Sequence, residues 1–126
     1  MLAAALAFGA PADAMPSPLH LGEADNGGTV ALEPGQRLIL ALPSVATAGY
    51  RWRIHRLDRR VLEETEAPLE QPGPAGIPGA PGRVEFRFRA GESGTTPLEL
   101  ELRRPFEAPS IPPARRFGVT IRVRSR

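Results

Sequence analysis

The chain contains no cysteine and only two histidines, His20 and His55, which stand far apart in the sequence. Without cysteine there is no disulfide, no thiolate zinc site, no iron–sulfur cluster and no cysteine nucleophile. Two isolated histidines do not supply the ligands of a metal site. We therefore expect a protein that holds no metal and no cofactor.

Groups for acid–base and nucleophilic catalysis are also scarce. The two histidines and the scattered serines do not combine into a nucleophile, a base and an orienting acid. The acidic run from Glu63 to Glu66 has no partner at catalytic spacing. We expect no catalytic residue, and the chain is predicted not to be an enzyme.

The sequence has no long hydrophobic run. Its longest nearly apolar stretch, residues 1–12, is shorter than the roughly 20 residues that a membrane-spanning helix needs. This stretch leads into Ala12-Asp13-Ala14, which fits the small-x-small pattern read by signal peptidase, and then into a proline-rich segment. Residues 1–14 are therefore interpreted as a signal peptide, truncated because the usual basic residues are absent, and a short hydrophobic core helix is the alternative. Residues 15–126 would then form the mature domain of a periplasmic or secreted protein with no membrane span.

Lysine is absent, so all 16 basic residues are arginine and the isoelectric point is about 10.3. The 14 carboxylates nevertheless leave a formal net charge of only +2. The arginines are diluted by acidic residues and lack interleaved aromatic residues, which disfavours a nucleic-acid partner. Solvated strand faces explain this charge pattern better.

A chain of 126 residues is long enough for one domain, at roughly 100–200 residues per domain. Glycine and proline together contribute 28 residues, about twice their average share. We therefore expect a single globular domain with many turns and loops.

Alternation of apolar and charged residues is the dominant pattern, and it predicts strands that bury one face. It is strictest at residues 83–90, where Val84, Phe86, Phe88 and Ala90 alternate with charges. The other predicted strands are 29–32, 37–42, 50–55, 61–65, 98–102 and 117–124. The fold class predicted is all-β, an immunoglobulin-like antiparallel β-sandwich of about seven to eight strands, and a small barrel is the alternative.

Two of these strands carry opposite charges on their outer faces. If residues 83–90 pair with residues 98–102 through the turn at 91–95, Arg87 and Arg89 face Glu99 and Glu101. We expect this pairing. A second turn is predicted at Glu33-Pro34-Gly35-Gln36.

Three connecting segments differ from ordinary polar loops. Residues 43–49 are small and mostly uncharged, residues 70–82 are rich in glycine and proline, and residues 103–115 contain four prolines. Loops of this composition lose less entropy when a partner immobilises them. They suit a preorganised binding edge.

These segments resemble the chagasin-like inhibitors of papain-type cysteine peptidases. The family places an N-P-T-T-G-Y-x-W motif after a strand that ends in Leu-Pro, as at Leu42-Pro43 here. The matching residues are Thr47, Gly49, Tyr50 and Trp52, and the departures are Val45, Ala46 and Ala48. Residues 79–82 are similar to the family's glycine-rich middle loop, and residues 104–107 are similar to its R-P-W motif with phenylalanine in place of tryptophan.

The resemblance implies an immunoglobulin-like sandwich whose three loops fill the cleft of a papain-like cysteine peptidase, the expected protein partner. The inhibition implied is reversible and competitive, and the chain is expected to be a monomer. Gly49 would tolerate a positive φ or a close approach. The residues expected to bind the peptidase are Thr47, Ala48, Gly49, Gly79, Ala80, Pro81, Gly82, Arg104, Pro105 and Phe106.

Structural roles compete with binding roles at several of these positions. Trp52 is predicted to be the central core tryptophan and Tyr50 to pack at the strand rim. Arg104 could serve only to pair with Glu107, and Phe106 could lie inside the sandwich. The alternative function is a non-inhibitory immunoglobulin-like binding module of the cell envelope, which the departures from the family motifs favour.

Overall fold

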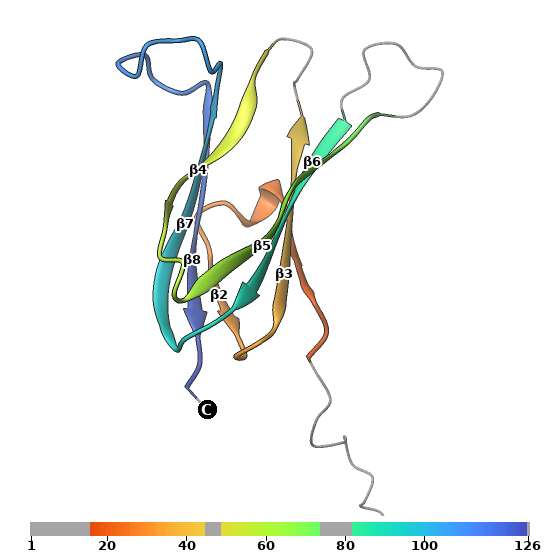
Figure 1. Ribbon diagram of the computed structural model, residues 1–126, viewed down its shortest axis with the longest axis vertical. Coiled ribbons are helices and arrows are strands. Elements are labelled where there is room, and N and C mark those ends of the chain that lie inside the picture. Colours follow the sequence, from red (N-terminus) through yellow and green to blue (C-terminus); the bar gives the residue numbers. More distant parts are fainter. Residues whose placement is uncertain (1–15, 45–48, 74–81, 126) are drawn as a thin grey trace, which may run out of the picture.

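The computed structural model describes residues 16–44, 49–73 and 82–125. Within these residues eight strands form two facing sheets, as Figure 1 shows. The elements in chain order are β1 (Leu19–Leu21), the short 3₁₀ helix η1 (Glu23–Asp25), β2 (Thr29–Leu32), β3 (Arg37–Ser44), β4 (Arg51–Leu57), β5 (Leu62–Gln71), β6 (Gly82–Ala90), β7 (Gly94–Arg103) and β8 (Arg115–Val123). The predicted all-β sandwich is confirmed, and two separate sheets exclude the small barrel.

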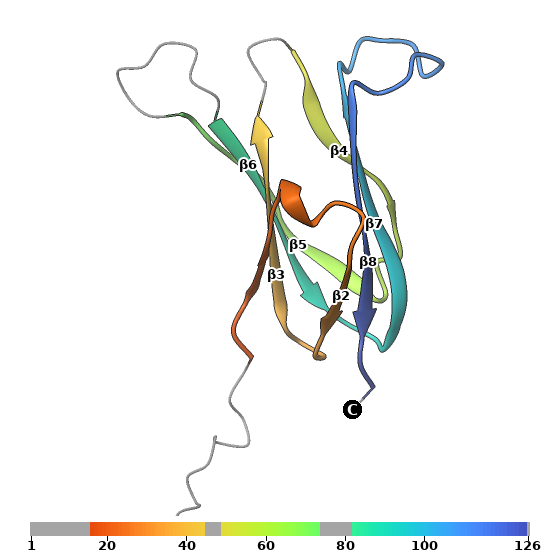
Figure 2. The ribbon, with the colours of Figure 1, turned by 180° about the vertical axis from the view of Figure 1, so that it is seen from behind.

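The strand orders are β1-β3-β6-β5 in one sheet and β2-β8-β7-β4 in the other. The edge strands β1 and β2 run parallel to their neighbours, and all other pairings are antiparallel. The connection between β1 and β2, which contains η1, crosses from one sheet to the other on the side seen in Figure 2. The seven predicted strands are present, whereas the three-residue β1 is too short for alternation to reveal it.

The core lies between the sheets and is built from the apolar members of each alternating strand. Trp52 is 8% exposed and Leu100 is fully buried, so the prediction of a core tryptophan is confirmed. The remaining core is mainly leucine, with Phe86, Phe88 and Phe117 as its large rings. At about 1.5–3 kcal/mol for each large apolar side chain buried, this core is the main stabilising contribution.

The predicted pairing of residues 83–90 with residues 98–102 is wrong. Strand β6 lies in one sheet and β7 in the other, so Arg87 is opposite Ile39 and Glu66 instead of a β7 glutamate. The intervening turn bonds to the β4–β5 turn, with the amide of Gly91 donating to the carbonyl of Val61. The sequence alternates in the same way whether two successive strands pair in one sheet or face each other across the core, because each strand buries one face in either case.

The turn at Glu33–Gln36 is present as predicted. The amide of Gln36 donates to the carbonyl of Glu33 over 3.0 Å, and Gly35 has φ of 82°. This turn carries the chain from β2 in one sheet to β3 in the other.

One end of the sandwich gathers the ends of six strands. There β3, β5 and β7 end and β4, β6 and β8 begin, at the upper end of Figure 1. We call the described residues 43–44, 49–50, 71–73, 82–83 and 104–115 the loop edge. No helix in the described part of the chain is long and apolar enough to cross a membrane.

Candidate functional site

The connection between β7 and β8 begins with a tight turn that presents Phe106. The amide of Glu107 donates to the carbonyl of Arg104 over 3.0 Å, which makes Pro105 the second residue of a β-turn. Proline favours this position because its ring fixes φ near the value that the turn requires. Phe106 is 76% exposed, so it lies outside the core and the alternative of an interior phenylalanine is wrong.

Gly49, in the connection between β3 and β4, lies against this phenylalanine. Its φ is +85°, a conformation that residues with a side chain rarely adopt. A β-carbon built on Gly49 would be 3.8 Å from Cε2 of Phe106, an ordinary van der Waals contact, so the positive φ and not a lack of space favours glycine here. The positive φ expected as one possibility at Gly49 is present.

The Arg104 side chain lies between the two connections. Its guanidinium carbon is 4.6 Å from the centroid of the Tyr50 ring and 6.0 Å from that of the Phe106 ring. A cation over an aromatic face within about 6 Å is attracted by the ring electrons. Arg104 therefore ties the start of β4 to the turn that carries Phe106.

The guanidinium of Arg104 forms no ion pair with Glu107 among the described residues, so the expected alternative of a simple Arg104–Glu107 pair is wrong. Its Nε is buried and has no hydrogen-bond acceptor in the described part of the chain. Stacking, and not pairing with a carboxylate, holds this side chain.

Two further contacts fix the base of the loop edge. The indole Nε1 of Trp52 donates to the carbonyl of Pro43 over 2.9 Å and so joins the start of β4 to the end of β3. Arg103 donates from Nε to Glu101 over 2.7 Å and from its terminal nitrogen to the carbonyl of Ile111. The bond from Arg103 lowers the pKa of the Glu101 carboxyl below its ordinary value, because it stabilises the ionised form.

Gly82 has a different environment from Gly49. It is the first residue of β6 and lies opposite Ser44 of β3, and a β-carbon on it would collide with the carbonyl oxygen of Gln71. The Oγ of Ser44 donates to Glu70 of β5 over 2.8 Å, across the position where Gly82 has no side chain. Gly82 therefore lets β5 and β6 approach at the base of their connection.

The structure thus brings together Gly49, Arg104, Pro105 and Phe106 and places Gly82 on the opposite sheet. Five other predicted binding residues lie outside the described residues: Thr47, Ala48, Gly79, Ala80 and Pro81.

The family follows from comparison with known proteins. Residues 31–121, most of the chain, match the model of the chagasin family peptidase inhibitor I42. The chain belongs to this family. Among curated proteins, none matches the chain significantly. Because the chagasin family consists of peptidase inhibitors, both the predicted resemblance and the prediction that the chain is not an enzyme are confirmed.

Solved structures share the fold of this chagasin-family chain. It is similar to the cysteine protease inhibitor EhICP2 from Entamoeba histolytica, with a TM-score of 0.75 and 22% identity over 86% of this chain and 96% of that chain. It is similar to amebosin, with a TM-score of 0.67 and 22% identity over 86% and 99% of the two chains. It is also similar to PbICP-C in complex with falcipain-2, with a TM-score of 0.58 and 17% identity over 86% and 100%.

Two exposed apolar side chains at or near the loop edge of the chagasin-family chain were not among the residues that the sequence analysis singled out. The large hydrophobic residues that are exposed in the described part are Phe106, Leu69 at 51% and Ile111 at 42%. Ile111 lies on the loop edge, and Leu69 lies two residues before β5 ends there. An apolar residue inside a proline-rich loop, as at Ile111, is the sequence signal that could have identified one of them.

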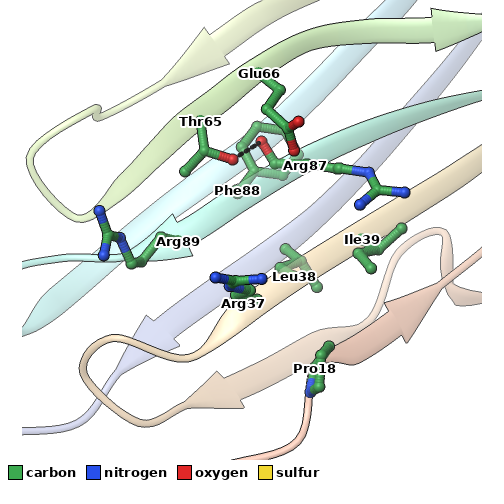
Figure 3. Close-up of a pocket in the computed structure, with 9 residues that line it drawn as sticks. All are labelled: Pro18, Arg37, Leu38, Ile39, Thr65, Glu66, Arg87, Phe88 and Arg89. Carbon is green, nitrogen blue, oxygen red and sulfur yellow. Dashed lines mark hydrogen bonds between the residues drawn. The ribbon is translucent and has the colours of Figure 1, made fainter. Parts of the chain in front are cut away.

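A surface hollow of about 550 Å³ lies away from the loop edge, on the outer face of the β1-β3-β6-β5 sheet (Figure 3). Arg37, Arg87 and Arg89 line it together with Glu66, and Arg37 begins β3 at the end opposite to the loop edge. Within the described residues, no group of histidine, aspartate and glutamate side chains could hold a metal ion.

Proposed function

We propose that the chain is a reversible, competitive inhibitor of papain-like cysteine peptidases that inserts its loop edge into the active-site cleft. The observation that carries the proposal is the exposed Phe106, held on a proline turn against Gly49 and Arg104. Exposure of a large ring is unfavourable for the free protein, and an anchored ring gives a partner a preordered apolar contact. The proposal is also supported by family membership, and by the neighbour EhICP2, which is a cysteine protease inhibitor.

Each connection contributes a different chemistry to this proposal. Thr47, Ala48 and Gly49 form a slim, uncharged segment that suits the space beside a catalytic cysteine and histidine. Pro105 and Phe106, with Arg104 bracing them, would lie on an apolar wall of the cleft. Residues 79–82 would fill the remaining side. Inhibition of this kind is steric, because no bond of the inhibitor is placed for productive cleavage.

The proposed setting is the periplasm or the outside of the cell, with residues 1–14 as a signal peptide and residues 15–126 as a monomeric mature domain. The support is the small-x-small pattern at Ala12-Asp13-Ala14 and the proline-rich segment that follows it. N-terminal sequencing of the exported protein tests this part of the proposal, and cleavage after Ala14 is the expected result.

The test of function is a titration of papain and of a cathepsin L-type enzyme with the chain. We expect inhibition that saturates at one inhibitor per peptidase. Thr47→Arg should weaken it at least about tenfold, since a long charged side chain would have to lose its water beside the catalytic centre. Its thermal stability should match that of the unchanged protein.

No inhibition of either enzyme would favour the alternative, a non-inhibitory binding module. Full inhibition by Thr47→Arg would remove this residue from the interface.

A further inference from the structure

The outer face of the β2-β8-β7-β4 sheet carries a concentration of positive charge next to the loop edge. We call Arg51, Arg53, Arg103 and Arg116 the basic strip. Arg51 is directly opposite Arg103, and in the next row Glu101 lies opposite both Arg53 and Arg116. These side chains point away from the core, because their strand neighbours Trp52, Leu102 and Phe117 are buried.

Glu101 pairs with two of the four arginines in the strip. Glu101 accepts the hydrogen bond from Arg103 at 2.7 Å, and its other oxygen is 3.9 Å from Nε of Arg116. Arg51 and Arg53 form no ion pair within the described residues. Four guanidinium groups against a single carboxylate leave a formal excess of three positive charges.

This arrangement is unfavourable for the sheet alone. Like charges directly opposite each other on neighbouring strands are destabilising, and Arg51 and Arg103 are such a pair. On the other sheet, the row of Arg83 also holds Pro43 and Gln71, and the row of Glu85 holds Ala41 and Leu69, so one arginine stands beside one glutamate there. Among the described residues, an excess of positive charge therefore flanks the loop edge on the side of the β2-β8-β7-β4 sheet.

We propose that the basic strip meets an acidic surface beside the active-site cleft of the target peptidase. The proposal rests on the proposed function, because it assumes that the loop edge occupies that cleft. Arg51 directly follows Tyr50 and Arg103 directly precedes Arg104, so a partner seated on the loop edge brings its own surface against the strip. Complementary charge at the side of an interface acts mainly by accelerating the encounter.

A nucleic acid is a poorer fit for this surface. Glu99 and Glu101 lie within the same face, and the described residues of this face include no exposed phenylalanine, tyrosine or tryptophan on which a base could stack.

The experiment measures the association rate constant with two papain-like cysteine peptidases, one of strongly negative and one of positive net charge, at about 20 mM and about 300 mM NaCl. The test variant combines Arg51→Glu with Arg53→Gln, which avoids placing a new glutamate opposite Glu101. The matched control combines Arg37→Glu with Arg122→Gln. The control changes the net charge by the same amount as the test variant, but at exposed strand positions remote from the loop edge.

We expect fast association with the acidic peptidase that slows by roughly tenfold at the higher salt concentration. The test variant should associate about tenfold more slowly at low salt and lose most of the salt dependence, with little change in the dissociation rate. The control should retain most of the wild-type rate.

The proposal would be overturned if the association rate of the wild type did not depend on the salt concentration. It would also be overturned if the test and control variants slowed association equally. A third contradiction would be that the strip is needed for binding to anionic vesicles but not for association with the peptidase. Failure of the wild type to inhibit any peptidase would contradict the proposed function instead.

Discussion

Phe106 is the residue that we expect to contribute most to binding and least to the stability of the fold. Because it is 76% exposed, its ring contributes little to the free energy of unfolding. We expect Phe106→Ala to weaken inhibition by about tenfold or more, mainly through faster dissociation, and to leave the melting temperature nearly unchanged. Phe106→Trp adds apolar area and should retain or improve the affinity. Measuring inhibition and thermal unfolding on both variants checks this, and a large loss of stability in Phe106→Ala would contradict it.

Arg104 and Tyr50 form a contact that can be measured as a pair. The guanidinium lies 4.6 Å from the ring centroid and about 0.5–1 kcal/mol of coupling is typical of such a contact near the surface. A double-mutant cycle with Arg104→Gln and Tyr50→Leu should show this coupling in the free energy of unfolding, because the contact is already formed in the free protein. Arg104→Lys, which keeps the charge but not the planar group, should restore only part of it. Purely additive effects would mean that Arg104 does not position the loops.

At the scale of single elements, alternation was enough to predict most strands because each buries one face against the same core. It could not predict which strands are neighbours, which is why the β6–β7 pairing was wrong. The sequence also could not reveal that Arg104 stacks on Tyr50, since that contact joins residues from two connections that only the folded sandwich brings together. The exposure of Phe106 could be anticipated, because it follows a proline in a loop and lies outside any alternating strand.

The base of the β5–β6 connection depends on Gly82. A β-carbon there would collide with the carbonyl of Gln71, which is backbone and cannot move aside without separating the two strands. We expect Gly82→Ala to lower the free energy of unfolding by about 1–3 kcal/mol, as overpacking typically does. Gly118→Ala is the matched control, because a β-carbon at Gly118 meets only ordinary van der Waals contact at 3.7 Å and its φ is not positive. Chemical denaturation of both variants decides the point, and equal stabilities would refute the steric explanation.

For the whole molecule, Glu101 links stability to pH. Arg103 lowers the pKa of its carboxyl in the folded protein below the value of about 4.3 found for a free glutamate. A lowered folded-state pKa gives stability that is present above the unfolded pKa and is lost as the pH falls through the folded one. We therefore expect Glu101→Gln to be less stable than the wild type at pH 7, by about 1 kcal/mol, and this difference to shrink as the pH falls below the unfolded-state pKa.

The control for this pH prediction is Glu99→Gln. The Glu99 side chain is 37% exposed, and its ion pair with Arg56 is longer, at 3.5 Å. Replacing its carboxylate should therefore change the free energy of unfolding little at any pH. The same stability difference for Glu101→Gln at pH 2 and pH 7 would show that ionisation of Glu101 is not the cause.

The central claim for the molecule is that its loop edge occupies the active-site cleft of a cysteine peptidase. The most direct measurement is the apparent inhibition constant for papain or a cathepsin L-type enzyme at increasing substrate concentration. If inhibitor and substrate exclude each other from the cleft, the apparent inhibition constant rises linearly with substrate concentration. For Phe106→Ala, this apparent constant is higher at every substrate concentration. An inhibition constant that does not depend on substrate concentration would place the inhibitor elsewhere on the peptidase and contradict the account.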